Sequence, residues 1–421
     1  MKHGFLLISL CAMTGLFSGA LYAAEPVHPP GLLPTATVRP LLEQDPSVAA
    51  ARAGLEAGRA GASALEASPY EWIPRITGQQ RRVESGPRYN EWNVGIDRTI
   101  RLPGKSSADR NMGKAVMEAA QAHYGEALRE AARDFIGLWV DWLAAEHSLE
   151  LNAKNLQSVQ TSLAAVEKRS RAGDASKLDM SLARAELAEQ KRLHNDAKTQ
   201  AKAAWLRLST RFPGLKREVT PLPMPQPLTE EIEFWRERIL SESDELKIVQ
   251  AKMKHAQALA QRAQAEKTPD PTVGLYTASE VGGRERITGI SLSIPIPSGV
   301  RDARHAKAIA EAEALTQEVE LKKRQLEMEI ASAVVTAQGH YDSLQIAQEN
   351  TTAMQENASL MQRAYALGEV ELQAMLLATR VPRRFVWNLT ARIDSSRARW
   401  GLWTTRYSEL STNPRGCVLC S

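Results

Sequence analysis

The chain has 421 residues, a formal net charge of +4 and only 5% aromatic residues. This length suits two ordinary domains or one large repetitive one, and the abundance of Ala, Glu, Gln, Arg and Leu favours long helices over a thick globular core. Basic and acidic residues alternate along almost the whole chain, so the small positive charge predicts no nucleic-acid partner.

The first residues have the features of a targeting segment. Lys2 precedes an apolar run at 5–17, and small residues follow up to Ala24. This pattern predicts a secretory signal peptide over residues 1–24 and an exported mature chain. A membrane anchor is the alternative interpretation, but the run is shorter than the ~20 residues that a membrane-spanning helix needs.

One short phrase occurs twice in the sequence. Residues 95–110 read GIDRTIRLPGKSSADR, and residues 289–304 read GISLSIPIPSGVRDAR. In both copies apolar and polar residues alternate up to a proline, which is typical of a strand with one apolar and one polar face. Because a proline ends a strand and a helical pattern follows, each copy predicts a strand-to-helix junction. The predicted junction residues are Pro103, Gly104, Pro297 and Gly299.

A partner strand precedes each copy of the phrase. The segments 76–83 and 273–281 have a weaker alternation, and both begin shortly after a proline. Turn-rich residues at 84–90 and 282–286 connect them to the following strand. Each half of the chain is therefore predicted to contain one β-hairpin.

Long helical patterns follow both hairpins, at about 108–172 and 302–367. Each spans roughly 65 residues, or about 100 Å at 1.5 Å per residue. Near their far ends apolar residues recur in alternating steps of three and four, the spacing of a coiled-coil seam; an ordinary amphipathic helix is the alternative. A glycine, Gly173 or Gly368, then predicts a helix end and a chain reversal.

Shorter helical patterns flank these units. They are predicted at 45–67 and 243–267, before the hairpins, and at 176–210 and 372–410, after the two glycines. The two shorter helices of each half together match the long helix in length. We therefore expect them to stack end to end beside it.

The chain is thus predicted to contain two structural repeats, each with a helix, a β-hairpin, a long helix, a tip and a return helix. Their predicted bounds are 25–212 and 231–410, with a Pro-rich linker at 213–230 and a tail at 411–421. The predicted fold class is mainly α with a small β part, in which long helical hairpins are duplicated and two β-hairpins contribute four strands.

Strands of about ten alternating residues suit an outer-membrane β-barrel. A membrane-spanning sheet must close, and four strands are too few because the smallest such barrels use about eight. Three chains would form a twelve-stranded barrel, and two chains would form a narrow one filled by side chains. Soluble hairpins packed on the helices are the alternative. The polar residues predicted to face the barrel lumen are Asp97, Thr99, Arg101, Ser291 and Ser293.

The repeated tips carry related phrases, RSRAGDASKLD at 169–179 and RAYALGEVELQ at 363–373. Together with the duplicated hairpins and the PG and PSG junctions, they resemble the TolC family of outer-membrane efflux proteins over nearly the whole mature chain. The short length and the phrase LPGK resemble the CzcC-like, cation-efflux branch of that family.

The resemblance implies a homotrimer with a twelve-stranded β-barrel in the outer-membrane lipid and a helical tunnel in the periplasm. It implies a passive exit duct that serves an inner-membrane efflux pump through a periplasmic adaptor protein, with heavy-metal cations as the cargo of the branch. The adaptor would dock at the tips. The implied docking residues are Arg169, Gly173, Asp174, Ser176, Asp179, Arg363, Gly368, Glu369 and Glu371.

The sequence predicts no enzyme and no cofactor. GKSS at 104–107 is not a phosphate-binding loop, because Thr99 stands where that motif needs a glycine. The histidines are scattered without metal-ligand spacing, and no nucleophile, histidine and acid form a recognisable set. Cys417 and Cys420 are interpreted as a disulfide or as having no special role, with a soft-metal site as the alternative.

Three other functions stay open from the sequence. A periplasmic coiled-coil adaptor or structural protein would not enter the membrane, although adaptors carry one helical hairpin between Gly- and Val-rich halves that this chain lacks. An exit duct for type I secretion would share the same architecture. A periplasmic enzyme is the third, for which no site is evident.

Overall fold

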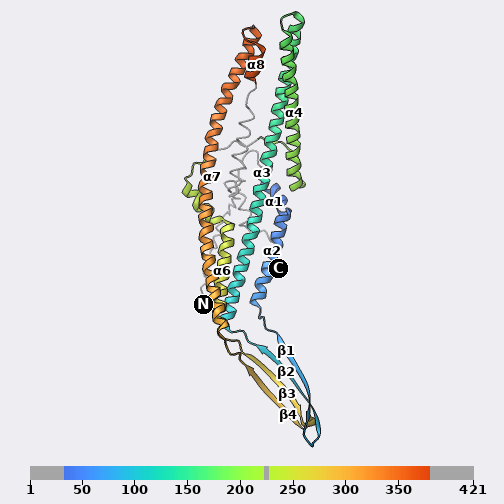
Figure 1. Ribbon diagram of the computed structural model, residues 1–421, viewed down its shortest axis with the longest axis vertical. Coiled ribbons are helices and arrows are strands. Elements are labelled where there is room, and N and C mark those ends of the chain that lie inside the picture. Colours follow the sequence, from blue (N-terminus) through green and yellow to red (C-terminus); the bar gives the residue numbers. More distant parts are fainter. Residues whose placement is uncertain (1–32, 222–226, 380–421) are drawn as a thin grey trace, which may run out of the picture.

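The computed structural model describes residues 33–221 and 227–379. Figure 1 shows a long molecule with a four-stranded sheet at one end and two helical tips at the other. Two long helices, α3 (Pro103–Ala172) and α7 (Val300–Leu367), connect the sheet with the tips. This arrangement places the hairpin loops and the helical tips at opposite ends of the protein.

The remaining helices and strands are shorter. Around α3 and α7, the chain forms α1 (Thr35–Glu43), α2 (Pro46–Glu66), β1 (Trp72–Arg82), β2 (Arg88–Thr99), α4 (Lys177–Arg211), α5 (Ile232–Glu242), α6 (Asp244–Glu266), β3 (Thr272–Glu280), a 3-10 turn (Val281–Gly283), β4 (Glu285–Ser293) and α8 (Leu372–Thr379).

The order of elements in the first half returns in the second. The series α2, β1, β2, α3, α4 corresponds to α6, β3, β4, α7, α8, which confirms the predicted duplication of helical hairpins and β-hairpins. Both long helices end directly before the predicted glycines, Gly173 and Gly368. The predicted return helix of the second half is described only as far as Thr379; its remainder, 380–410, lies outside the described residues.

Two short helices were not expected from the sequence. α1 has Pro40 in its interior, and a proline removes a helical hydrogen bond, so the sequence there does not favour a helix. α1 forms because Val38 and Leu42 are buried against the rest of the protein. α5 follows the Pro-rich linker and buries Trp235 against α7. Both helices therefore depend on tertiary packing more than on local propensity.

The four strands form one antiparallel sheet in the order β1-β2-β3-β4. β2 and β3 come from different halves, yet they pair continuously from Trp92↔Ser279 to Thr99↔Thr272. β1 and β4 are the edges, and no other strand in the described ranges pairs with them. The two predicted hairpins thus combine into one surface.

The strand ends differ from the prediction. β1 starts at Trp72 rather than after Pro74, which is tolerated because an edge strand has one row of N–H groups without a partner. β2 and β4 end at Thr99 and Ser293, before the junction prolines rather than at them. In the first half, Arg101 and Leu102 between β2 and Pro103 attach the sheet to the helices instead.

The main core lies midway along α3. Phe135, Trp139 and Trp142 on α3 pack against Leu208 and Phe212 at the end of α4, and α1 and α2 contribute their buried valine and leucine side chains. α2 and α4 follow each other along α3 (Figure 1), which confirms the end-to-end stacking expected for the first half. The aromatic cluster therefore holds the point where these helices meet.

Candidate functional site

One face of the sheet is polar in its centre. Asp97 on β2, Gly274 on β3 and Ser291 on β4 stand opposite one another in the register. A Cβ at position 274 would collide with the Asp97 carboxylate and the Ser291 hydroxyl, so the glycine leaves room for both side chains. The Ser291 hydroxyl donates to Asp97 at 3.4 Å, and Arg75 on β1 forms an ion pair with Asp97. This contact set crosses all four strands.

A second charged cluster lies on the same face, nearer the hairpin loops. Glu91 is only 4% exposed and accepts a hydrogen bond from the Gln79 amide at 2.8 Å. The Arg81 guanidinium lies 3.1 Å from Glu91 and 2.9 Å from Glu280, and so joins β1, β2 and β3. The sequence analysis missed this cluster because it assigned 84–90 to the turn and gave Glu91 no place on the strand that follows. The only trace of this cluster in the sequence is the weak alternation of the segment 76–83, which contains Gln79 and Arg81.

The opposite face of the sheet is apolar and exposed. Its exposed apolar side chains are Trp72, Ile76, Trp92, Val94, Ile96, Leu275, Ile290 and Leu292. Arg98 interrupts this face, and the structure accounts for it because its guanidinium lies 4.8 Å from the centre of the Trp72 ring on the neighbouring strand. A cation over an indole face is stabilised by the ring quadrupole.

Four of the five predicted lumen residues share the polar face. The register aligns Thr99, Thr272 and Ser293, with the two threonine hydroxyls 2.8 Å apart, and Asp97 and Ser291 share the next row on that face. Arg101 is the exception, and its placement on the strand was wrong. β2 ends at Thr99, and the Arg101 side chain turns away from the sheet to the end of α2.

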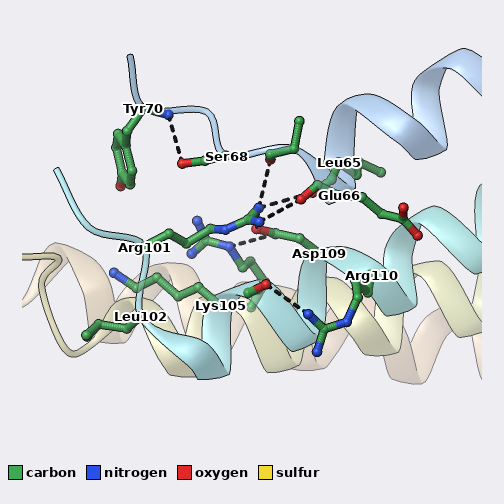
Figure 2. Close-up of polar contacts among 12 residues, drawn as sticks. Leu65, Glu66, Ser68, Tyr70, Arg101, Leu102, Lys105, Asp109 and Arg110 are labelled. Carbon is green, nitrogen blue, oxygen red and sulfur yellow. Dashed lines mark hydrogen bonds and ion pairs between the residues drawn. The ribbon is translucent and has the colours of Figure 1, made fainter. Parts of the chain in front are cut away.

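Figure 2 shows how Arg101 connects the sheet with the helices. Its guanidinium donates to the last carbonyls of α2, at 3.1 Å to Leu65 and 2.7 Å to Glu66, and also to the Asp109 carboxylate of α3 at 3.0 Å. A cation at a helix C-terminus is favourable because unpaired carbonyls concentrate negative charge there. Asp109 also accepts from Arg262 of α6 at 2.8 Å, which links the two halves.

Beside this group lies a buried ion pair between Lys105 and Asp270. The Lys105 ammonium is 2.9 Å from Asp270, and their side chains are only 4% and 3% exposed. Asp270 also accepts from the Tyr70 hydroxyl at 2.7 Å and from the Leu102 N–H at 3.1 Å. Burial raises the pKa of Asp270, but the Lys105 ammonium together with these two hydrogen bonds outweighs it and holds the pKa below its ordinary value. The hydrogen bond to Asp270 raises the pKa of Tyr70.

The predicted junction residues lie at the starts of the two long helices. Pro103 is the first residue of α3, where its missing N–H costs nothing. A Cβ at Gly104 would meet the Ala265 side chain of α6 at 3.7 Å, an ordinary contact. Gly299 is the N-cap of α7, and Pro297 lies between β4 and α7. The second half has its own counterpart of Arg101, because the guanidinium of Arg301 donates to the final carbonyl of α6, that of Glu266.

At the opposite end, both tips have the same backbone turn. Gly173 and Gly368 have φ angles of +87° and +80°, in the left-handed region that suits glycine. The N–H after each glycine bonds back to the helix at 2.9 Å, from Asp174 to Arg169 and from Glu369 to Ala364. Paired turns of this kind end both long helices in the same way.

Side chains fix the start of α4 and the contact between the tips. Ser176 and Asp179 form a reciprocal capping box, with both side chain to N–H distances at 3.0 Å. The Arg169 guanidinium lies 5.0 Å from the Tyr365 ring centre, which connects α3 with α7. A small apolar cluster between the tips consists of Val166, Ala183, Leu372 and Met375. The other predicted docking residues, Asp174, Arg363, Glu369 and Glu371, are exposed.

We expect Gly173→Ala and Gly368→Ala each to destabilise the tip by about 1–2 kcal/mol, because a Cβ is unfavourable at positive φ. Gly339→Ala is the matched control, since this helical glycine has open space around its Cβ position. The control should stabilise α7 by about 0.5–1 kcal/mol. Thermal unfolding followed by circular dichroism measures both the expected loss of stability in the tip variants and the expected gain in the control. Equal effects of the three variants would contradict a special role for the tip turns.

The sequence matches the family model described as outer membrane efflux protein over residues 38–211 and 235–381. The first matched segment runs from within α1 to the end of α4, and the second runs from within α5 to beyond the end of α8. The chain belongs to the outer membrane efflux protein family. No curated protein sequence matches it.

Solved channel structures share the fold of this efflux protein. CusC aligns with a TM-score of 0.70 at 17% identity over 87% of this chain and 91% of that one. VceC from Vibrio cholerae has a TM-score of 0.70 at 15% identity, covering 87% of this chain and 95% of that one. The open state of the MtrE channel from Neisseria gonorrhoeae has 0.66 at 17%, covering 90% and 88%. Likeness at such identities shows the fold alone.

Within the described ranges, this efflux protein has no group of three or more His, Cys, Asp and Glu residues placed to hold a metal ion. In the same ranges, no helix has both the length and the apolar character to cross a bilayer. The predicted signal peptide at 1–24 and the tail with Cys417 and Cys420 lie outside the described residues.

Proposed function

We propose that this efflux protein is a passive exit duct in the outer membrane, assembled as a homotrimer whose sheets close into a twelve-stranded barrel. The observation that carries the proposal is the two-faced sheet with unpaired edges at β1 and β4. An apolar sheet face suits lipid, but free strand edges do not, because no water is present to bond their N–H and C=O groups. Pairing β1 of one chain with β4 of the next removes all free edges.

The apolar face has the composition of a membrane-spanning surface. Trp72 and Trp92 point to this face near its two ends, six residues apart in the register of the β1-β2 pair. Six residues correspond to about 20 Å along a strand, or roughly 15 Å of height at the usual tilt of about 40°. Ile100 and Ile294 extend the apolar surface toward the helices. An apolar band with aromatic residues near its borders is typical of outer-membrane barrels, where the band is about 25 Å high.

The charges on the polar face favour cations as cargo. On this face the strands carry four carboxylates and two guanidinium groups, which gives a net charge of −2 per chain. The carboxylates are those of Glu91, Asp97, Glu280 and Glu285, and the guanidinium groups are those of Arg75 and Arg81. A lumen with excess negative charge raises the local concentration of cations. This observation supports the cation-efflux branch over ducts for neutral compounds or polypeptides.

At the tips, we propose docking of a periplasmic adaptor that connects the duct with an inner-membrane pump. Exposed charged residues surround both turns, with Asp174 and Glu369 directly after the two glycines. The rigid turns and the capping box at Ser176 hold these groups in fixed positions. In this proposal the duct is passive, so the pump supplies the energy for export.

The first test is the native mass after membrane fractionation and mild detergent extraction. A trimer in the outer-membrane fraction is the expected result. A monomer or dimer in the soluble periplasmic fraction would contradict the duct and support a periplasmic adaptor or structural protein.

The second test is the reversal potential of single trimers in planar bilayers under a salt gradient. We expect cation selectivity, and we expect Glu280→Gln with Glu285→Gln to remove most of it because the net charge of the polar face then becomes zero. Thr277→Val with Thr288→Val on the opposite face is the control, because it alters that face without changing the charge of the polar face, and it should leave the potential unchanged. An unselective wild-type channel would contradict cations as the preferred cargo.

A further inference from the structure

The apolar face of the sheet ends in three exposed arginines on the side of the hairpin loops. Arg82 and Arg88 stand opposite each other at the end of the β1-β2 pair. Arg286 on β4 pairs with Ser279 on β3, and Ser279 lies opposite Trp92 on β2. Arg286 therefore belongs to the same face and lies in the row of Trp92. All three side chains are exposed. We call Arg82, Arg88 and Arg286 the loop-end arginines.

Among the residues that the structure describes, the loop-end arginines differ from those of the polar face in having no acidic partner. Arg75 and Arg81 each form ion pairs with carboxylates of neighbouring strands. For the loop-end arginines, the described parts of the chain provide no ion pair, and the face they occupy has no Asp or Glu along its strands. Three guanidinium groups on one face therefore keep their full hydrogen-bonding capacity for an external anion.

Their height on the sheet corresponds to the polar border of a membrane, an argument that rests on the proposed function. The Arg82↔Arg88 pair lies four residues beyond Trp92 in the register, which is about 13 Å along a strand. At the usual strand tilt of about 40°, this is a height of roughly 10 Å from Trp92 toward the hairpin loops. A neutral pair of Gln80 and Asn90, joined at 3.1 Å, fills the row between them. Arg82 and Arg88 therefore lie beyond the apolar band, and Arg286 lies in the row of Trp92 at its border, where lipid headgroups begin.

We propose that the loop-end arginines bind the phosphate groups of an anionic glycolipid in the outer leaflet of the outer membrane. The guanidinium group is planar and always charged, and its paired N–H donors match phosphate oxygens in two parallel hydrogen bonds. In the proposed barrel, β1 of one chain adjoins β4 of the next, so Arg82 and Arg286 flank the seam between chains. A phosphorylated lipid at this seam would contact two chains and stabilise their contact.

The test measures lipid retained by the full-length trimer with native mass spectrometry. The probe is diphosphorylated lipid A, compared with lipid A whose phosphates have been removed and with zwitterionic phosphatidylethanolamine. We expect the diphosphorylated form to be retained selectively. The triple variant Arg82→Gln, Arg88→Gln, Arg286→Gln should bind it at least about tenfold more weakly, because each basic residue contributes to binding at an anionic membrane surface.

The control removes three arginines of the exposed helical surface, Arg59, Arg192 and Arg236, by the same change to glutamine. It should retain lipid A like the wild type. Unchanged retention by the triple variant of the sheet, or equal retention of the dephosphorylated lipid, would overturn the proposal. A triple variant that still reaches the outer membrane as a trimer but retains equal lipid refutes this inference alone, whereas a wild type absent from that membrane refutes the duct.

Discussion

Asp270→Ala is expected to destabilise the folded protein by about 3–5 kcal/mol. The change removes the partner of Lys105 at a site where both side chains are almost fully buried, and it leaves an ammonium group without a counter-ion in a medium that solvates it poorly. The Tyr70 hydroxyl and the Leu102 N–H lose their acceptor at the same time. The sheet would then be less firmly attached to α3, and denaturant unfolding of the purified protein measures the loss.

An exposed ion pair at the same end of the molecule provides the control. Lys267 and Asp302 lie 3.1 Å apart, but the Asp302 side chain is 71% exposed. Asp302→Ala should therefore cost no more than about 1 kcal/mol. The double variant Lys105→Met, Asp270→Leu should recover part of the stability, because it leaves no buried charge alone. Similar losses for Asp270→Ala and Asp302→Ala would show that burial does not strengthen the junction.

The same residue gives the junction a defined pH dependence. The pKa of Asp270 is held below its ordinary value of 3.8 in the folded protein. A group of this kind contributes its full stabilisation above the ordinary value and loses it as the pH falls through the lower pKa of the folded state. The stability difference between wild type and Asp270→Ala should thus be constant near neutral pH and shrink only below about pH 4.

The features that the sequence predicted well depend on neighbouring residues. Gly173 and Gly368 stop their helices because the turn needs a positive φ, which is a property of one residue. The alternation around Asp97 predicted its face correctly because side chains change sides at every residue of a strand. Such local rules fix element type and face without knowledge of the fold.

The features that the sequence did not predict depend on distant residues. Arg101 continues the alternation of β2, yet it leaves the strand because the carbonyls at the end of α2 and the carboxylate of Asp109 attract its guanidinium. Arg98 is a charge on an otherwise apolar strand face, and its position is explained only by its cross-strand neighbour Trp72. Asp270 showed no motif, and its role follows only from the packing of the second half against Lys105. Each case needed the pairing between segments far apart in the chain.

Trp139→Ala is expected to cost about 3–5 kcal/mol, the range observed for large aromatic residues replaced in a core. Trp139 is 0% exposed and lies within the aromatic cluster of α3, 5.0 Å from Trp142 and 6.1 Å from Phe135 between ring centres. Its removal opens a cavity where α1, α2 and α4 meet on α3. Because several helices border the cavity, its walls cannot collapse without separating other contacts.

Trp205→Ala is the matched control for this change, because that ring packs at the border of the cluster and is only partly buried. Its cost should be clearly smaller, and Trp139→Phe should lie between the two since a benzene ring fills most of the space. If Trp139→Ala and Trp205→Ala unfold at the same denaturant concentration, the cluster is not the region that holds the stacked helices together. Trp139→Ala should greatly lower the free energy of unfolding of the helical part but leave the β-sheet intact. That result would show that this cluster stabilises the helical part independently of the junction at Asp270.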